Sequence, residues 1–315
     1  MARSIPYPGK LIDVGGRNLH ALLRGKGDPL VVFEAGIAAS SLSWALVEPA
    51  VAEFTSVLSY DRAGLGWSDP APHRSAALDA ARDLALLLDA LGYTKSVLLV
   101  GHSFGGVIAR IFQQQYRERV CGMVLLDPVA PGEWRDMPAF RKTMLARGVA
   151  LSRPGETLAR AGVVGLALRM LLNGSAVIPK MMGRASAAKG GLRMAERLAR
   201  EVGKLPRELW PAVASHWSQA RCFRAMGNAL ESLPISVHQI EEKLPLGDFP
   251  LVVLSAADST RDAILEHAAD ARLSTRGRHL VLANTGHWIP LDAPAAVVGA
   301  IKETILEQVG CERSV

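Results

Sequence analysis

The chain has 315 residues, 49% of them hydrophobic, and a formal net charge of +6. A chain of this size and composition can bury a large core within one domain. Its three cysteines, Cys121, Cys222 and Cys311, are too widely spaced for a disulfide framework or a metal motif, so we expect a reducing compartment and no metal ion.

Apolar runs of strand type alternate with amphipathic runs of helix type along most of the chain. In chain order, the predicted strands lie near residues 11–14, 19–23, 30–34, 55–60, 97–100, 122–126, 251–255 and 279–282. A helix with a buried stripe at Leu84, Leu87, Leu88 and Leu91 is expected to end at Gly92. Such alternation predicts a parallel sheet with helices on both faces.

The alternation stops between residues 131 and 247, where the composition favours helices. We therefore expect a core made of residues 1–130 and 248–315, with residues 131–247 inserted as a helical cap. The cap segment holds 18 Lys and Arg but 9 Asp and Glu. Three interpretations stay open: a solvated face, a basic rim that attracts anionic substrates, or contact with an anionic membrane surface. The apolar run at 161–172 is expected to cover an acyl pocket.

The segment 97–106, VLLVGHSFGG, is the most informative stretch of the chain. It places a G-x-S-x-G turn between an apolar strand and an amphipathic helix, as a nucleophile elbow requires. Gly101 and Gly105 leave room for a sharp turn that exposes the hydroxyl of Ser103. The backbone N–H of Phe104, at the start of the helix, is a candidate oxyanion donor.

A serine nucleophile needs a base and a group that orients the base, in the chain order Ser, acid, His. His287 follows a predicted strand and a glycine turn, which favours it as the base. Two aspartates follow apolar strands, and we prefer Asp258 as the acid over the alternative Asp127. The second oxyanion donor is expected from the small-residue loop after residues 30–34, at the backbone N–H of Ile37.

These motifs resemble those of the α/β-hydrolase superfamily, in its form with a helical cap. The resemblance is carried by residues 101–106, by Gly286 and His287, and by the segment 60–69, YDRAGLGWSD. It implies an α/β fold with an eight-stranded, mostly parallel sheet, helices on both faces and a Ser-acid-His triad. Epoxide hydrolases and haloalkane dehalogenases use Asp where this chain has Ser103, so the resemblance argues against those two activities.

The motifs favour hydrolysis of a carboxylic ester through an acyl-serine, without a metal or organic cofactor. Lactonase, amidase or peptidase, and cofactor-free haloperoxidase activities are alternatives on the same triad, and a non-catalytic ligand-binding protein is an alternative of another class. We expect a small-molecule substrate with an apolar acyl group and no nucleic-acid partner. The N-terminus lacks the apolar core of a signal peptide and no segment predicts a membrane span, so we expect a cytoplasmic protein.

Overall fold

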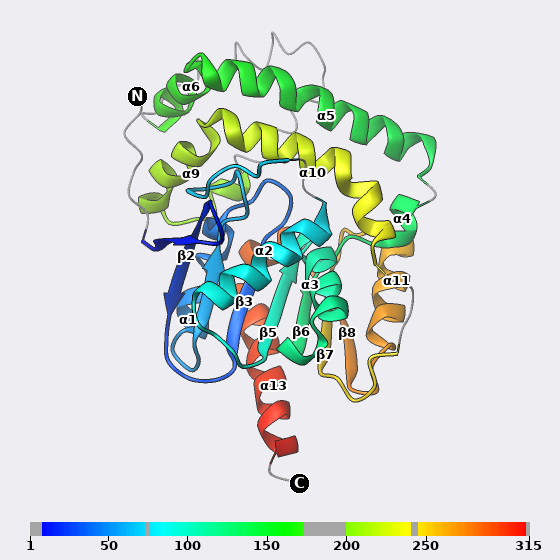
Figure 1. Ribbon diagram of the computed structural model, residues 1–315. Coiled ribbons are helices and arrows are strands. Elements are labelled where there is room, and N and C mark those ends of the chain that lie inside the picture. Colours follow the sequence, from blue (N-terminus) through cyan, green and yellow to red (C-terminus); the bar gives the residue numbers. More distant parts are fainter. Residues whose placement is uncertain (1–7, 74–75, 136, 173–199, 241–244, 313–315) are drawn as a thin grey trace.

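The computed structural model describes residues 8–312 except 74–75, 136, 173–199 and 241–244. Its centre is an eight-stranded sheet in the order β1-β2-β4-β3-β5-β6-β7-β8 (Figure 1). Strands β1, β2 and β4 pair antiparallel, and all other neighbours pair parallel. All eight predicted strands are present, which confirms the expected fold class.

The strand bounds follow the apolar runs of the sequence to within a few residues. Strands β3, β5, β6 and β7 are buried along almost their whole length, as expected for strands covered by helices on both faces. The strands are β1 (Lys10–Asp13), β2 (Asn18–Arg24), β3 (Leu30–Glu34), β4 (Val57–Tyr60), β5 (Val97–His102), β6 (Val120–Leu126), β7 (Leu251–Ala256) and β8 (Gly277–Leu282).

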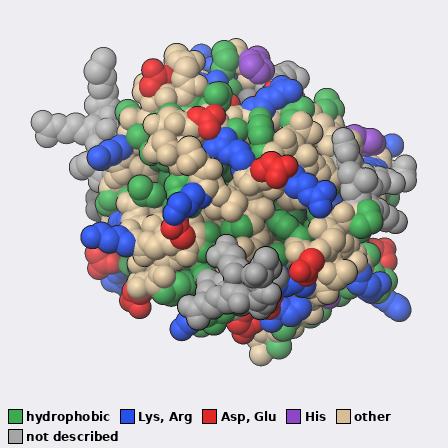
Figure 2. Space-filling model, turned by 60° about the horizontal axis from the view of Figure 1, so that its bottom comes forward, with side chains coloured by type: hydrophobic (Ala, Val, Ile, Leu, Met, Phe, Trp, Pro, Cys, Tyr) green, Lys and Arg blue, Asp and Glu red, His purple; other side chains and the backbone are tan. Residues whose placement is uncertain are grey.

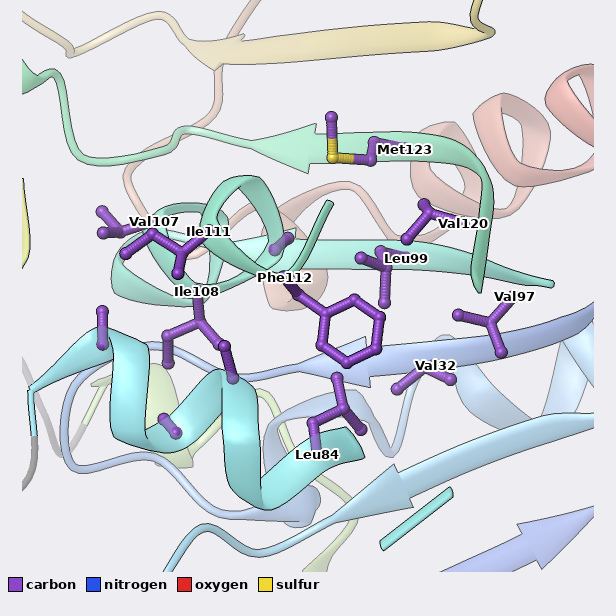
Figure 3. Packing of buried hydrophobic residues seen from close by; sticks show 14 of the residues in the cluster. Val32, Leu84, Val97, Leu99, Val107, Ile108, Ile111, Phe112, Val120 and Met123 are labelled. Atoms are coloured by element: carbon purple, nitrogen blue, oxygen red, sulfur yellow. The ribbon is translucent and has the colours of Figure 1, made fainter. Parts of the chain in front are cut away.

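Helices cover both faces of the sheet and build one apolar core on each side. On one face, α2 (Ala77–Ala90), α3 (Phe104–Gln115) and α11 (Arg261–Ala271) pack on the strands, and Figure 3 shows Leu84, Ile108 and Phe112 meeting Val32 and Leu99 there. The other face carries η1 (Ser41–Trp44), α1 (Glu48–Val51), α12 (Ile289–Asp292) and α13 (Pro294–Glu312). The short η2 (Arg117–Arg119) leads from α3 into β6.

The segment between β6 and β7 is helical and lies over one end of the sheet (Figure 1). Its longest helices, α5 and α10, pack against each other. Its described helices are α4 (Pro131–Arg135), α5 (Ala139–Arg160), α6 (Val163–Leu172), η3 (Arg207–Leu209), α9 (Trp210–Trp217) and α10 (Ala220–His238). Within the described residues, this layer occupies the place expected for a cap; its role as a separate domain stays a prediction.

The outer surface mixes charges of both signs on the side opposite the cap. Figure 2 brings this lower side forward and shows Lys and Arg interspersed with Asp and Glu. Among the helices described, none is long and apolar enough to cross a membrane.

Two glycines let the start of α3 approach its neighbours closely. A Cβ on Gly105 would lie 2.1 Å from the carbonyl oxygen of Glu34, at the end of β3. A Cβ on Gly106 would lie 2.7 Å from Cβ of Pro128, just after β6. Any larger side chain would therefore push α3 away from the carboxyl ends of β3 and β6.

We predict that Gly105→Ala lowers the free energy of unfolding by about 1–3 kcal/mol or more, because backbone atoms must move to accept the methyl group. Gly299→Ala in α13 is the matched control, since a Cβ there meets no atom within 4 Å. The control should stabilise the protein by about 0.5–1 kcal/mol through helix propensity. Urea unfolding measures both values; a Gly105→Ala variant as stable as the control would contradict this packing account.

Candidate active site

Ser103 stands at the turn between β5 and α3 in a strained backbone conformation. Its φ of 54° and ψ of −118° lie outside the regions that non-glycine residues normally adopt. The turn is held by a hydrogen bond from the Ser103 N–H to the carbonyl of Leu126, 3.0 Å long. A strained residue fixed by its surroundings is typical of a functional position.

His287, in the loop after β8, links Ser103 to the carboxylate of Asp127 at the end of β6. Its Nε2 lies 2.9 Å from Oγ of Ser103, and its Nδ1 lies 2.6 Å from Oδ2 of Asp127. In the neutral tautomer that fits these distances, Nδ1–H donates to Asp127 and Nε2 accepts the Ser103 hydroxyl. The loop after β8 is held in turn by Asp292, which accepts from the Gly286 N–H at 2.8 Å.

Asp127 directly follows β6 and is almost fully buried. Its Oδ1 accepts from the N–H of Ala256 at 3.1 Å and from the hydroxyl of Ser259 at 2.5 Å. Burial raises the pKa of this carboxyl, but the hydrogen bonds from His287 and Ser259 outweigh burial and lower the pKa to about 2. The carboxylate is therefore charged at neutral pH.

The preference for Asp258 as the partner of His287 is corrected by this geometry. Asp258 lies on the exposed turn after β7, beside Gly286, whereas Asp127 makes the hydrogen bond to the His287 ring. The physical reason is that Ala256 and Ser259 hold the buried carboxylate of Asp127 beside the His287 ring, where the chain leaves β6 with a φ of 41° at Asp127. Asp127, the alternative acid in the sequence prediction, is therefore the carboxylate that binds the His287 ring.

The two predicted oxyanion donors lie on segments next to Ser103. Phe104 is the first residue of α3, so its N–H has no acceptor within the helix. Ile37 follows Gly36, and a Cβ on Gly36 would lie 3.4 Å from Cβ of Ser103. The roles of these N–H groups remain predictions.

His102, the residue before Ser103, also takes part in the site. Its Nε2–H donates to the carbonyl oxygen of His287 at 2.8 Å, and the two rings lie 4.9 Å apart. Burial, reinforced by the nearby His287 ring, lowers the pKa of His102 to about 3. His102 is therefore neutral at physiological pH and holds the backbone of the base.

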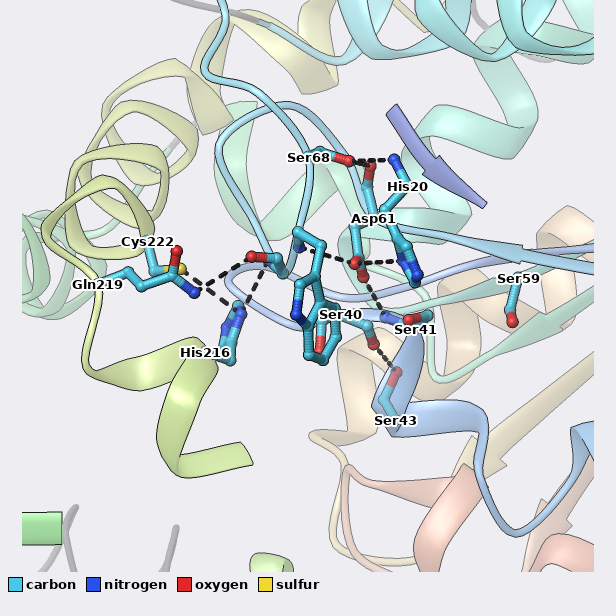
Figure 4. Close-up of polar contacts among 12 residues, drawn as sticks. His20, Ser40, Ser41, Ser43, Ser59, Asp61, Ser68, His216, Gln219 and Cys222 are labelled. Carbon is cyan, nitrogen blue, oxygen red and sulfur yellow. Dashed lines mark hydrogen bonds and ion pairs between the residues drawn. The ribbon is translucent and has the colours of Figure 1, made fainter. Parts of the chain in front are cut away.

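A buried polar network supports the loop after β3 from behind (Figure 4). Asp61 accepts from the N–H of Ser41 at 2.7 Å and contacts His20 at 2.9 Å. His216, from α9 in the cap, accepts from the N–H of Gly66 at 2.9 Å and donates to the carbonyl of Ala38 at 3.0 Å. No sequence pattern pointed to His216, whereas Asp61 lies in the segment that carried the family resemblance.

A pocket opens beside Phe104, between the turn after β4, the start of α2 and the cap helix α10. Most of its lining side chains are small, and its charged members are Arg62, Asp83, Arg221 and Arg224. Phe104, one of the two residues predicted to supply an oxyanion donor, borders this pocket.

Comparisons with known proteins agree on the fold. A family model described as the alpha/beta hydrolase fold matches residues 29–294. A thermophilic esterase from Thermogutta terrifontis superimposes with a TM-score of 0.63 at 20% identity, over 96% of this chain and 99% of the esterase. A putative epoxide hydrolase from Pseudomonas aeruginosa gives a TM-score of 0.69 at 17% identity, over 96% of both chains.

Curated relatives match about two fifths of the chain. A haloalkane dehalogenase from Sphingobium indicum is 32% identical over 134 residues, which cover 41% of this chain and 45% of the relative. A soluble epoxide hydrolase from Corynebacterium is 34% identical over 119 residues, which cover 38% of this chain and 41% of the relative. The matches span less than half the length of these relatives.

We predict that His102 makes the protein less stable in acid. The pKa of His102 is about 3 in the folded protein and 6.5 in its unperturbed state, so the unfolded chain binds more protons between these values. The contribution of His102 to the free energy of unfolding is therefore fully present above the unfolded pKa. It falls by about 1.4 kcal/mol per pH unit as the pH drops below that value.

The His102→Gln variant keeps a donor for the His287 carbonyl but does not titrate. Urea unfolding from about pH 6 to about pH 4 should give a slope smaller than that of the wild type by about 1.4 kcal/mol per pH unit. Equal slopes for the two proteins would show that His102 does not stay neutral in the folded state.

Proposed function

Because the chain belongs to the α/β-hydrolase fold family, we propose that it is a serine hydrolase that cleaves carboxylic esters through an acyl-serine intermediate. The observation that carries this proposal is the unbroken chain of hydrogen bonds from Asp127 through His287 to Ser103. This arrangement activates a hydroxyl as a nucleophile, with a base to take its proton and a carboxylate to orient the base.

In the proposed mechanism, Oγ of Ser103 attacks the substrate carbonyl carbon while Nε2 of His287 takes the hydroxyl proton. The N–H groups of Ile37 and Phe104 stabilise the oxyanion of the tetrahedral intermediate. The intermediate then collapses, and the alcohol leaves with the proton from His287. Water next attacks the acyl carbon, gives its proton to His287 and releases the carboxylic acid as Ser103 regains its hydrogen.

The chemistry of a serine nucleophile favours an acyl substrate over an alkyl halide or an epoxide. Attack of Ser103 on a halogen-bearing or epoxide carbon would leave an alkyl ether, which has no carbonyl for water to attack. An acyl-serine has that carbonyl, so water completes the cycle through the same oxyanion site. Dehalogenase and epoxide hydrolase activities are therefore features of the relatives that we do not assign to this chain.

An apolar acyl group fits the surroundings of the serine. Val129, whose N–H donates to the Ser103 carbonyl at 3.2 Å, is half-buried, and so is Ile37, which follows Gly36 beside Ser103. Such side chains favour an apolar group at the carbonyl end of the substrate.

We predict that Ser103→Ala lowers kcat for a p-nitrophenyl ester by at least about a thousandfold, because the nucleophile is lost. The melting temperature should stay the same, since the side chain contributes little packing. Ser152→Ala, a buried serine in α5, is the control and should keep full activity. Retention of more than about a tenth of kcat in Ser103→Ala would rule out this nucleophile.

A pair of aspartate variants tests which carboxylate orients His287. Asp127→Asn should lower kcat by about 10³–10⁴-fold, because an amide cannot fix the ring tautomer or stabilise the imidazolium. Asp258→Asn makes the same chemical change on the neighbouring strand end and should leave kcat within about twofold. Steady-state kinetics on one ester compares them; a severe loss in Asp258→Asn with an active Asp127→Asn would reverse the assignment.

A further inference from the structure

The peptide between Gly36 and Ile37 is held from behind by the guanidinium of Arg62. Nη2 of Arg62 donates to the carbonyl oxygen of Gly36 at 2.5 Å, and Nη1 donates to the carbonyl of Ala35. Nη1 also donates to Oε1 of Glu34 at 2.6 Å. One guanidinium therefore binds three consecutive residues at the point where β3 becomes the loop beside Ser103.

This contact, together with the N–H of Ala39, which donates to the same Gly36 carbonyl at 3.2 Å, fixes the direction of the Ile37 N–H. The C=O and N–H groups of a trans peptide point in opposite directions, and the Gly36 carbonyl and the Ile37 N–H belong to the same peptide. The carbonyl faces Arg62, so the N–H faces the opposite side of the loop. A cation on the carbonyl also polarises the peptide, which strengthens the N–H as a donor.

Arg62 also contacts the segment that carries the other predicted donor, Phe104. Its guanidinium lies 5.8 Å from the ring centroid of Phe104, the residue whose N–H begins α3. Glu34, which is 1% exposed, neutralises the charge of Arg62 and is itself bound by the hydroxyl of Tyr60. The pair is therefore largely buried, with Glu34 enclosed and Arg62 reaching the wall of the pocket beside Phe104.

We propose that Arg62 is a positioning residue of the oxyanion hole, which aims the Ile37 N–H at the substrate carbonyl by holding the carbonyls of Ala35 and Gly36. This inference rests on the proposed function, because it concerns a hydrolase that forms an oxyanion at Ser103. Arg62 touches no reacting atom, and its effect on the reaction passes through one peptide group.

The geometry requires an arginine at this position. Three acceptors lie around one planar group, and a guanidinium can donate to all of them in a fixed fork. A lysine keeps the charge beside Glu34 but offers one flexible ammonium, which cannot hold both carbonyls in the same orientation. The later part of the loop has separate supports, Asp61 at Ser41 and His216 at Ala38.

Arg62→Lys separates a positioning role from a general structural one. With a p-nitrophenyl ester we expect kcat to fall by about 10- to 100-fold, somewhat less than the loss of a whole oxyanion donor, with KM changed by less than about threefold. The matched control is Arg110→Lys, because Arg110 has the same 11% side-chain exposure and pairs with Asp270 away from the loop. The control should keep wild-type kcat and KM.

Binding of an aryl boronic acid gives a readout that a loss of stability would not move. Oγ of Ser103 adds to the boron, its proton passes to His287, and one boron-bound oxygen takes the place of the oxyanion. In Arg62→Lys the inhibition constant should rise in proportion to the fall in kcat, while circular dichroism matches the wild type. If Arg62→Lys does not fold, the double variant Glu34→Gln/Arg62→Gln replaces it, because this variant buries no charge. It should lose kcat and boronic acid affinity in the same proportion.

Folded Arg62 variants with kcat and boronic acid affinity within about twofold of the wild type would overturn the inference. So would a loss of kcat without any loss of boronic acid affinity. Ser103→Ala keeps the two proposals distinguishable. An inactive Ser103→Ala beside a fully active Arg62→Lys contradicts the positioning role alone, whereas an active Ser103→Ala contradicts the proposed function and the inference together.

Discussion

The strained turn at Ser103 is the constraint on which the rest of the site depends. A positive φ at this residue lifts its side chain out of β5 and starts α3 within one residue. The turn fits against its neighbours because neither glycine has a side chain: a Cβ on Gly105 would clash with the carbonyl of Glu34, and a Cβ on Gly106 with Pro128. This close approach brings the carboxyl ends of β3 and β6 to the serine, so the loop of Ile37 and the carboxylate of Asp127 lie there together.

Local signals in the sequence were sufficient for the fold and for two members of the hydrogen-bonded chain. Each strand is an apolar run bounded by turn residues, so all eight could be predicted within a few residues. Ser103 and His287 stand in short motifs whose flanking strand, turn and helix are readable from neighbouring residues. Such patterns depend on sequence neighbours alone, which is why no three-dimensional information was needed to propose them.

The acid and its supports depend on contacts between distant segments. Asp127 and Asp258 both follow buried parallel strands, and β6 and β7 are neighbours in the sheet. Asp127 differs from Asp258 in being buried and in the donors that Ala256 and Ser259 bring to its carboxylate. Arg62, in the turn after β4, and His216, in the cap, both act on the loop after β3. No periodicity or spacing in the sequence marks such a contact.

Covalent labelling of the folded protein by a fluorophosphonate tests the central claim most directly, because this reagent phosphonylates serines that a neighbouring base activates. Peptide mass mapping then locates the modified residue. The hydrogen-bonded chain from Asp127 through His287 predicts one phosphonate per protein, on Ser103, together with complete loss of ester turnover. A protein that turns over an ester while Ser103 stays unmodified, or that carries the label on another residue, would contradict the account.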